Sequence, residues 1–162
     1  MNIGYDTYES ILGKLYIVVS DKGVERVFFC KDSFDKYLEK NNISQNKDIC
    51  KEAITQLDEY FNNSRKYFDL KLNIDTTDFR NRVYNELLKI PYGETRSYSD
   101  IAKSINNEKA VRAVGQANRC NKIPIIIPCH RVIGKNGKMV GYDGDKIDIK
   151  EILLRLEFDN KI

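Results

Sequence analysis

The sequence predicts an α+β protein in two parts, a strand-rich N-terminal domain over residues 1–75 and a mainly helical C-terminal domain over residues 76–162. Three observations predict this division. Residues 1–30 carry β-branched and aromatic side chains between glycine turns, residues 79–157 show repeated helical spacing, and the polar stretch 73–78 suits a linker. With 162 residues, 41 % of them hydrophobic, the chain is long enough for one medium domain or two small ones.

Three strands and two helices are expected in the N-terminal domain. The strands are predicted at residues 5–8, 15–19 and 24–30. Turns containing Gly13 and Gly23 separate them, which favours an antiparallel meander. Helical spacing follows over residues 33–41 and 49–62, and residues 68–72 are expected to return to the sheet as a further strand.

Four helices are expected in the C-terminal domain. The first starts near Phe79 and ends before Pro91, and the second follows an N-cap at Ser97. The third covers residues 109–119, with Val111, Val114 and Ala117 on its apolar side and Arg112 and Arg119 facing solvent; the fourth covers residues 148–157. Because a short polar break joins the second and third helices, they form a candidate helix-turn-helix.

Composition excludes several classes of protein. The sequence contains no apolar run of the roughly 20 residues that a membrane span needs, and its first ten residues lack the features of a signal peptide, so we expect a cytoplasmic protein that binds no membrane. Its four cysteines form no CxxC pair and are expected to be free thiols. The single histidine argues against a structural zinc site, and we expect no metal.

The excess of positive over negative charge lies in the second half of the chain. Residues 1–75 contain 11 Lys and Arg against 13 Asp and Glu, whereas residues 76–162 contain 16 against 11. An excess of this size is compatible with a polyanionic partner, although solvated surface lysines are its commoner cause.

The segment IPIIIPCHRVI, residues 123–133, is the most unusual in the chain. Its two prolines prevent a helix and predict an extended, buried segment that ends at Cys129. A free thiol is only a few per cent ionised at neutral pH, so a nucleophilic cysteine needs a base or a cation nearby. His130 is the only imidazole available, although neighbours in sequence often point apart. A third group would orient the base, and spacing alone does not decide between Glu151 and Glu157 in the last helix.

Three sequence blocks together resemble one family. They are IPYGETRSY at residues 90–98, AVGQANR at residues 113–119 and PCHRV at residues 128–132. At this spacing the chain resembles the O6-alkylguanine-DNA alkyltransferases, also called methylated-DNA-protein-cysteine methyltransferases, with the stronger match over residues 79–157. The resemblance implies a ribonuclease H-like N-terminal domain, a winged helix-turn-helix-like C-terminal domain, and repair of O6-alkylguanine in double-stranded DNA.

The resemblance implies a role for each catalytic residue. Cys129 corresponds to the acceptor, whose sulfur takes the alkyl group irreversibly in a single turnover. His130 corresponds to the base that takes its proton through a water, and Glu157 corresponds to the acid that orients the imidazole. Asn121 matches the asparagine that ties the recognition helix to the active-site turn. Tyr98 matches the tyrosine that donates a proton or a hydrogen bond to the departing base.

The resemblance also implies a DNA-binding surface and a guanine pocket. Arg112 corresponds to the finger that fills the base stack when the damaged nucleotide is flipped out. The minor groove of DNA is expected to meet Ser97, Tyr98, Ala113, Gly115 and Ala117, and the pocket is expected to be formed by Val132, Tyr142, Asp143 and Gly144. The implied protein is a monomer that uses no cofactor.

Some residues of the chain depart from the family pattern. Tyr84 stands where the family commonly has Trp. Gly144-Asp145 stands where Gly-Gly is usual, and this second departure leaves activity on bulky alkyl groups and on O4-methylthymine open.

One rival function is that of a non-catalytic protein that binds alkylated DNA, but such relatives replace the acceptor cysteine. The others are a Cys-His hydrolase or acyltransferase, and a DNA-binding regulator without catalysis.

Overall fold

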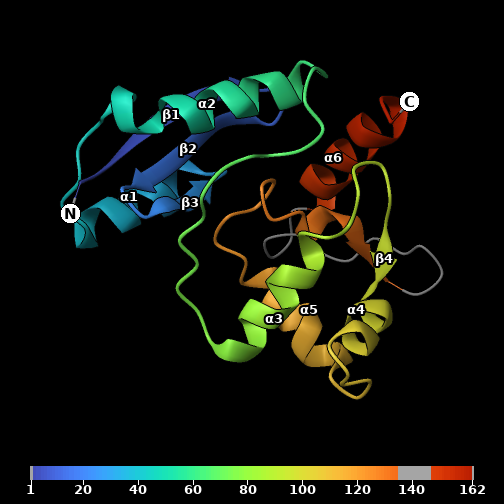
Figure 1. Cartoon of the computed structure of the whole chain (residues 1–162). Coiled ribbons are helices and arrows are strands. Elements are labelled where there is room, and N and C mark those ends of the chain that lie inside the picture. Colours follow the sequence, from blue (N-terminus) through green and yellow to red (C-terminus); the bar gives the residue numbers. More distant parts are fainter. Residues whose placement is uncertain (1, 135–146, 162) are drawn as a thin grey trace. The chain divides into compact units, whose positions relative to one another are not determined.

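The computed structural model describes residues 2–134 and 147–161 (Figure 1). The chain divides into two compact units, Met1–Ile74 and Asp75–Ile162. The first contains an antiparallel sheet and the second is mainly helical, so the predicted α+β class is confirmed. None of the helices within the described ranges is long and apolar enough to cross a membrane.

An antiparallel meander forms the centre of the first unit. Strands β1 (Ile3–Ser10), β2 (Gly13–Ser20) and β3 (Gly23–Phe28) pair in the order β1-β2-β3. Gly13 and Gly23 have φ angles of 94° and 127°, which L side chains rarely adopt, so glycine allows both tight turns. The three predicted strands are therefore confirmed, except that β3 ends at Phe28, so Phe29 and Cys30 lie beyond it, and Cys30 is the N-cap of the next helix.

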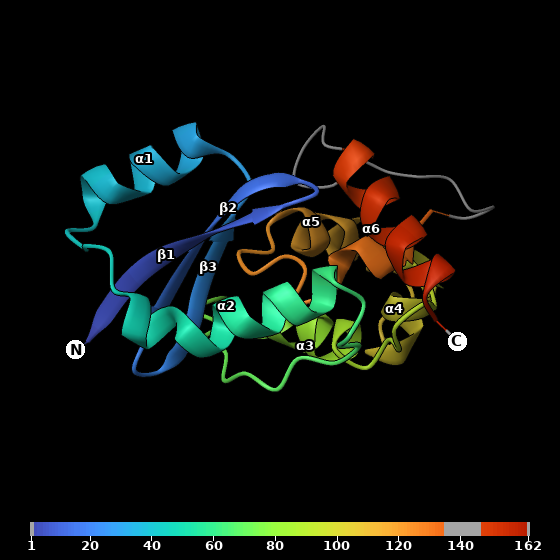
Figure 2. The ribbon, with the colours of Figure 1, turned by 90° about the horizontal axis from the view of Figure 1, so that it is seen from above.

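Helices α1 (Lys31–Lys40) and α2 (Lys47–Phe61) cover opposite sides of this sheet (Figure 2). Tyr16 and Val18 of β2 pack with Phe34 of α1, whereas α2 lies against β1 and β2. Burial on both faces explains why the sequence of β2 is almost continuously apolar rather than alternating.

The strand predicted at residues 68–72 is wrong. Within the described residues this segment makes only one isolated parallel bridge, between Leu72 and Val24. The Val24 N–H donates to the Lys71 carbonyl over 2.9 Å, and the Val24 carbonyl accepts from Asn73 N–H over 2.9 Å. One bridge satisfies the edge of β3 locally without extending the ladder.

Three short helices form the first part of the second unit: α3 (Asp78–Leu87), α4 (Tyr98–Ser104) and α5 (Val111–Arg119). Each packs against the other two. Tyr84, at the position where the family commonly has Trp, is buried and donates from its hydroxyl to the Ala117 carbonyl over 2.7 Å, which ties α3 to α5. Val111, predicted on the apolar side of α5, is instead 37 % exposed because it occupies the first turn, at the edge of this packing.

The remaining elements surround the Cys-His segment. A single 3-10 turn, η1 (Cys129–Arg131), leads into β5 (Val132–Ile133), which pairs in parallel with β4 (Arg96–Ser97). Helix α6 (Ile147–Asp159) packs against η1. Two segments 27 residues apart in sequence, those of His130 and Glu157, are thereby brought into contact.

Candidate active site

Cys129 lies at the end of a buried turn, residues 123–129, which we call the Cys129 turn. The prediction of an extended segment is wrong, because Ile127 N–H donates back to the Ile123 carbonyl over 2.9 Å and closes the chain on itself. Ile125 has a φ of 74°, a left-handed conformation that is unfavourable for a β-branched residue. The predicted burial is confirmed, and the Cys129 side chain has no exposed surface.

Two asparagines connect the Cys129 turn to α5. Asn118, buried in the last turn of α5, donates from Nδ2 to the Cys129 carbonyl over 3.2 Å. Asn121 donates from Nδ2 to the Ile127 carbonyl over 2.9 Å and to Cys129 Sγ over 3.1 Å. Its Oδ1 accepts from Ile123 N–H over 3.0 Å. Asn121 therefore fixes the turn and places a hydrogen-bond donor at the sulfur, a contact that favours a thiolate over a thiol.

The other three cysteines lie elsewhere in the fold. Cys50 is buried beneath the sheet, where its sulfur faces the carbonyls of Gly4 and Ile17, and burial raises its pKa to about 12. A thiol with so high a pKa is inert at neutral pH. Cys30, the N-cap of α1, and Cys120, the C-cap of α5, are half-buried and in no disulfide.

A buried carboxylate sits beside the histidine. His130 Nε2 and Glu157 Oε2 are 2.6 Å apart, and neither side chain has more than 1 % of its surface exposed. Arg131 donates to the same carboxylate twice, from Nε to Oε1 over 2.8 Å and from Nη2 to Oε2 over 3.0 Å. Because a carboxylate can only accept, His130 carries a proton on Nε2 and leaves Nδ1 as the basic nitrogen.

Burial and the neighbouring charges shift the pKa values of both His130 and Glu157. Burial lowers the pKa of His130, opposed by the adjacent Glu157 and reinforced by the cations Arg131 and Lys150. Burial would raise the pKa of Glu157, but the hydrogen bonds of His130 and Arg131, with the positive charges that both carry at the acid pH where this carboxyl titrates, outweigh it and hold that pKa well below its usual range. At neutral pH the carboxyl is therefore ionised and the imidazole neutral.

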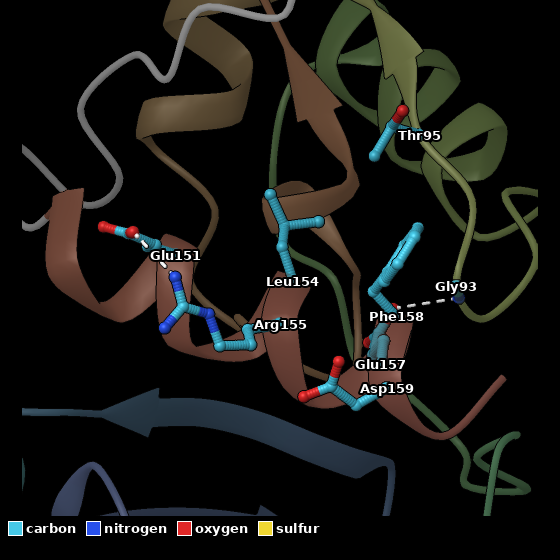
Figure 3. A pocket seen from close by; sticks show the side chains of 8 residues that line it. All are labelled: Gly93, Thr95, Glu151, Leu154, Arg155, Glu157, Phe158 and Asp159. Carbon is cyan, nitrogen blue, oxygen red and sulfur yellow. Dashed lines mark hydrogen bonds and ion pairs between the residues drawn. The ribbon is translucent and has the colours of Figure 1, made fainter.

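A backbone N–H completes the environment of Glu157. Gly93, in the loop before β4, donates to Oε1 over 3.3 Å, and Figure 3 shows this contact beside a groove of about 390 Å³. The groove is formed by the 93–95 loop and one side of α6, and neither Cys129 nor Tyr98 is among the residues that line it. Gly93 has a φ of 81°, and a Cβ there would lie 2.6 Å from Lys161 Cβ.

Replacing Gly93 with Ala is expected to destabilise the protein by about 1–3 kcal/mol, because it combines left-handed strain with a steric overlap. Urea unfolding followed by circular dichroism measures the loss. Gly13→Ala is the matched control, since Gly13 has a φ of 94° but no atom within 4 Å of an added Cβ. Equal losses in the two variants would show that the overlap with Lys161 has no effect.

Tyr98 and Lys150 approach each other near the cysteine. The capping box between Ser97 and Asp100 fixes the start of α4, so Tyr98 occupies its first position. Its ring lies 4.0 Å from where a Cβ on Gly115 would be, and burial raises the pKa of its hydroxyl. Lys150 of α6 is fully buried, and its Nζ donates to the Tyr98 hydroxyl over 3.4 Å. Burial lowers the pKa of Lys150 to about 8, while the charge of Cys129 opposes this shift.

Helix α5 exposes part of the predicted DNA-binding surface. Arg112 and Ala113 are exposed in its first turn, while Gly115 and the preceding Ser97 are half-buried. Ala117 is fully buried, as predicted for the apolar side of α5, and its carbonyl accepts from the Tyr84 hydroxyl, so it offers no exposed side chain for the predicted contact with DNA. The reason is helical phase: Ala117 follows Val114 by three residues and shares its buried side.

Comparison with known proteins assigns the family. A family model described as the DNA-binding domain of 6-O-methylguanine DNA methyltransferase matches residues 78–158, and a model of its ribonuclease-like domain matches residues 3–74. The chain belongs to the 6-O-methylguanine DNA methyltransferase family. The constitutive methylated-DNA–protein-cysteine methyltransferase of Bacillus subtilis is 44 % identical over 155 residues, 94 % of each chain. The Methanosarcina acetivorans protein of the same name is 46 % identical over 94 % of this chain and 97 % of its own.

Solved structures show the same relationship. The crystal structure of Mycobacterium tuberculosis O6-methylguanine methyltransferase is 39 % identical, with a TM-score of 0.89 over 98 % of this chain and 94 % of that one. A crystal structure of the M. tuberculosis protein OGT in complex with DNA is also 39 % identical, with a TM-score of 0.88 over 97 % of this chain and 94 % of that one.

The remaining site residues are those predicted for the pocket and those that the sequence did not predict. Val132, predicted to line the pocket, is buried at the start of β5, whereas Tyr142, Asp143 and Gly144 lie outside the described residues. Sequence reasoning missed Asn118, Arg131 and Lys150. Arg131 belongs to the PCHRV block and Asn118 to the AVGQANR block, so both could have been suspected, but no local signal distinguishes Lys150 from a solvated lysine.

Proposed function

We propose that this protein repairs DNA by moving an alkyl group from O6 of guanine in duplex DNA to Sγ of its own Cys129. The observation that carries the proposal is a fully buried Cys129 whose sulfur accepts from Asn121 and whose neighbour His130 is paired with Glu157. Relatives at 44 % and 46 % identity are named methylated-DNA–protein-cysteine methyltransferases, which supports the same activity here.

The reaction is an in-line displacement on the alkyl carbon. His130 accepts the thiol proton at Nδ1, directly or through one water, while Glu157 holds the imidazole in the required tautomer. The sulfur–carbon bond forms as the carbon–O6 bond breaks, and the electron pair of the broken bond leaves with guanine. Asn121 stabilises the charge that develops on sulfur before the attack.

Tyr98 supplies a proton, or a hydrogen bond, to the departing guanine. The Lys150 ammonium donates to the Tyr98 oxygen, which leaves the hydroxyl proton free to point toward the base. The cation also stabilises the phenolate that would form if the proton is transferred. Burial of Lys150 lowers its pKa to about 8, so the group remains mostly protonated at neutral pH.

The alkylated base must leave the duplex before it reaches a buried thiol. Extrusion costs a few kcal/mol, and Arg112, exposed at the start of α5, offsets part of this cost by filling the vacated stack. Small residues beside it, Ala113 and Gly115, let the helix backbone approach the minor groove closely. That groove carries little sequence information, which suits a protein that searches for lesions in any sequence.

The reaction is stoichiometric and needs no cofactor. A thioether is a poor leaving group at neutral pH, so the alkyl group stays on Cys129 and each molecule acts once. We further propose that the protein works as a monomer in the reducing cytoplasm, where the acceptor thiol is kept free of disulfides.

Intact mass spectrometry tests the proposal. Incubated with a duplex that contains one O6-methylguanine, the reduced protein is expected to gain one methyl group on Cys129 and to saturate at one equivalent of lesion. Cys129→Ser should bind the duplex without gaining mass, and Cys50→Ser should react like the parent. Multiple turnovers, or no gain with Cys129 verified as reduced, would refute the proposed chemistry and favour a hydrolase or a non-catalytic DNA-binding protein.

A further inference from the structure

Both carboxylate oxygens of Glu157 accept hydrogen bonds from groups other than His130. Oε2 lies 2.6 Å from His130 Nε2 and 3.0 Å from Arg131 Nη2, while Oε1 accepts from Arg131 Nε over 2.8 Å and from Gly93 N–H over 3.3 Å. Two parallel hydrogen bonds from a planar guanidinium make this the geometrically strongest kind of ion pair. His130 therefore competes with a permanent cation for the charge of its orienting carboxylate.

Arg131 is held in this position from its other side as well. Its Nη1 donates to the Ile90 carbonyl over 2.7 Å, and its guanidinium lies 5.8 Å from the centre of the Tyr92 ring. Only 7 % of the residue is exposed. A buried cation with all three nitrogens engaged cannot move away when the histidine changes its charge.

The balance of charge around His130 then favours the neutral imidazole. The charged groups that act on it are Glu157 and Lys150 from α6 and Arg131 from η1, and Tyr92 lies beside Glu157 and Arg131. Arg131 and Glu157 together carry no net charge, so a proton on His130 would add an uncompensated positive charge to a fully buried cluster. Burial lowers the pKa of His130 and Arg131 lowers it further, against the pull of Glu157.

We propose that Arg131 is a positioning residue that neutralises Glu157 and thereby keeps His130 in the uncharged form whose Nδ1 can accept the proton of Cys129. This rests on the proposed function, in which His130 is the base. Glu157 then orients the ring through its hydrogen bond without converting it into an imidazolium. If the full charge of Glu157 acted on His130 alone, the ring would take up a proton at higher pH and Nδ1 would no longer accept one.

The single histidine of the chain makes this directly measurable. In a proton NMR titration of the whole protein between pH 4 and pH 9, the only imidazole resonances are those of His130. Arg131→Met is expected to move their titration to higher pH than in the parent, because it removes the cation and leaves the carboxylate. Arg131→Lys, which keeps the charge, is expected to stay closer to the parent than Arg131→Met does.

Two further variants keep the result interpretable. Arg155→Met is the matched control, since Arg155 lies on α6 in an exposed ion pair with Glu151 and should leave the titration unchanged. Should Arg131→Met fail to fold, Arg131→Gln removes the same charge while retaining a donor for Glu157. An imidazole that titrates at the parent's pH in either folded, neutral variant overturns the proposal. Because the titration uses no DNA, the two failures are distinguishable: absence of alkyl transfer in the mass experiment would refute the proposed function, whereas an unshifted titration would refute the role of Arg131.

Discussion

Glu157→Gln is expected to lower the stability of the protein by about 3–5 kcal/mol and to slow methyl transfer by about 100-fold or more. The substitution leaves the buried guanidinium of Arg131 without its countercharge and removes the anion that orients His130. Urea unfolding gives the stability, and quenched-flow transfer of a labelled methyl group gives the rate. Glu151→Gln, on the same helix but in an exposed pair with Arg155, is expected to change either quantity little.

The pH dependence of stability provides an independent check on Glu157. A carboxyl whose pKa is depressed on folding contributes stability that is complete above its unfolded pKa, about 4.3, and lost as the pH falls. His130 acts in the same direction below about 6.5, because its pKa is also lower in the folded protein. The parent should therefore lose stability below about pH 6.5 through His130 and lose more below about pH 4.3 through Glu157, and this second, more acidic part of the loss should be reduced in Glu157→Gln. A slope in Glu157→Gln identical to that of the parent would contradict the buried ion pair.

Arg112→Ala is expected to slow repair of O6-methylguanine in duplex DNA by about 10- to 100-fold, or about 1.4–2.8 kcal/mol, while the reaction with free O6-benzylguanine changes little. The free base is already outside a helix, so no residue needs to fill a vacated stack. The two rates are compared by intact mass spectrometry over time. Tyr98→Phe, in contrast, should slow both reactions because it removes a donor to the leaving base.

The loss of a positive charge is separated from the loss of the finger by a second variant. Lys109→Ala removes an exposed cation just before α5 and should weaken duplex repair only slightly, and less so in high salt. Equal slowing of the duplex and free-base reactions in Arg112→Ala would exclude the finger role. A loss in Lys109→Ala as large as in Arg112→Ala would reduce that role to general attraction to phosphate.

Elements defined by local chemistry were predictable from the sequence. Gly13 and Gly23 mark the turns of the meander, and the capping box of Ser97 and Asp100 marks the start of α4. The Cys129 turn could not be predicted from the sequence, because prolines exclude a helix without specifying whether the chain continues extended or folds back. That outcome depends on the hydrogen bond from Ile127 to Ile123 and on Asn121, neither of which has a periodic signal.

The candidate site likewise contains residues that the sequence reveals and residues that only the structure reveals. The adjacency of Cys129 and His130 is visible in any reading of the sequence, but Glu151 and Glu157 are equivalent until the helix is placed. In the structure Glu151 is exposed and Glu157 is buried against η1. Lys150 was missed because long cations are almost always solvated, and only the packing of α6 buries this one beside Tyr98.

The complete burial of Cys129 has a kinetic consequence. An enzyme that turns over must open its site to release product, and this step often limits its rate. A thiol that keeps its alkyl group has no such step, since only repaired DNA departs. The turn that holds the cysteine can therefore be rigid, because no second cycle follows. Asparagines hold it on one side, and a buried ion pair lies on the other. Because each repair by this reaction consumes one protein molecule, the capacity for repair is set by the number of copies that the cell makes.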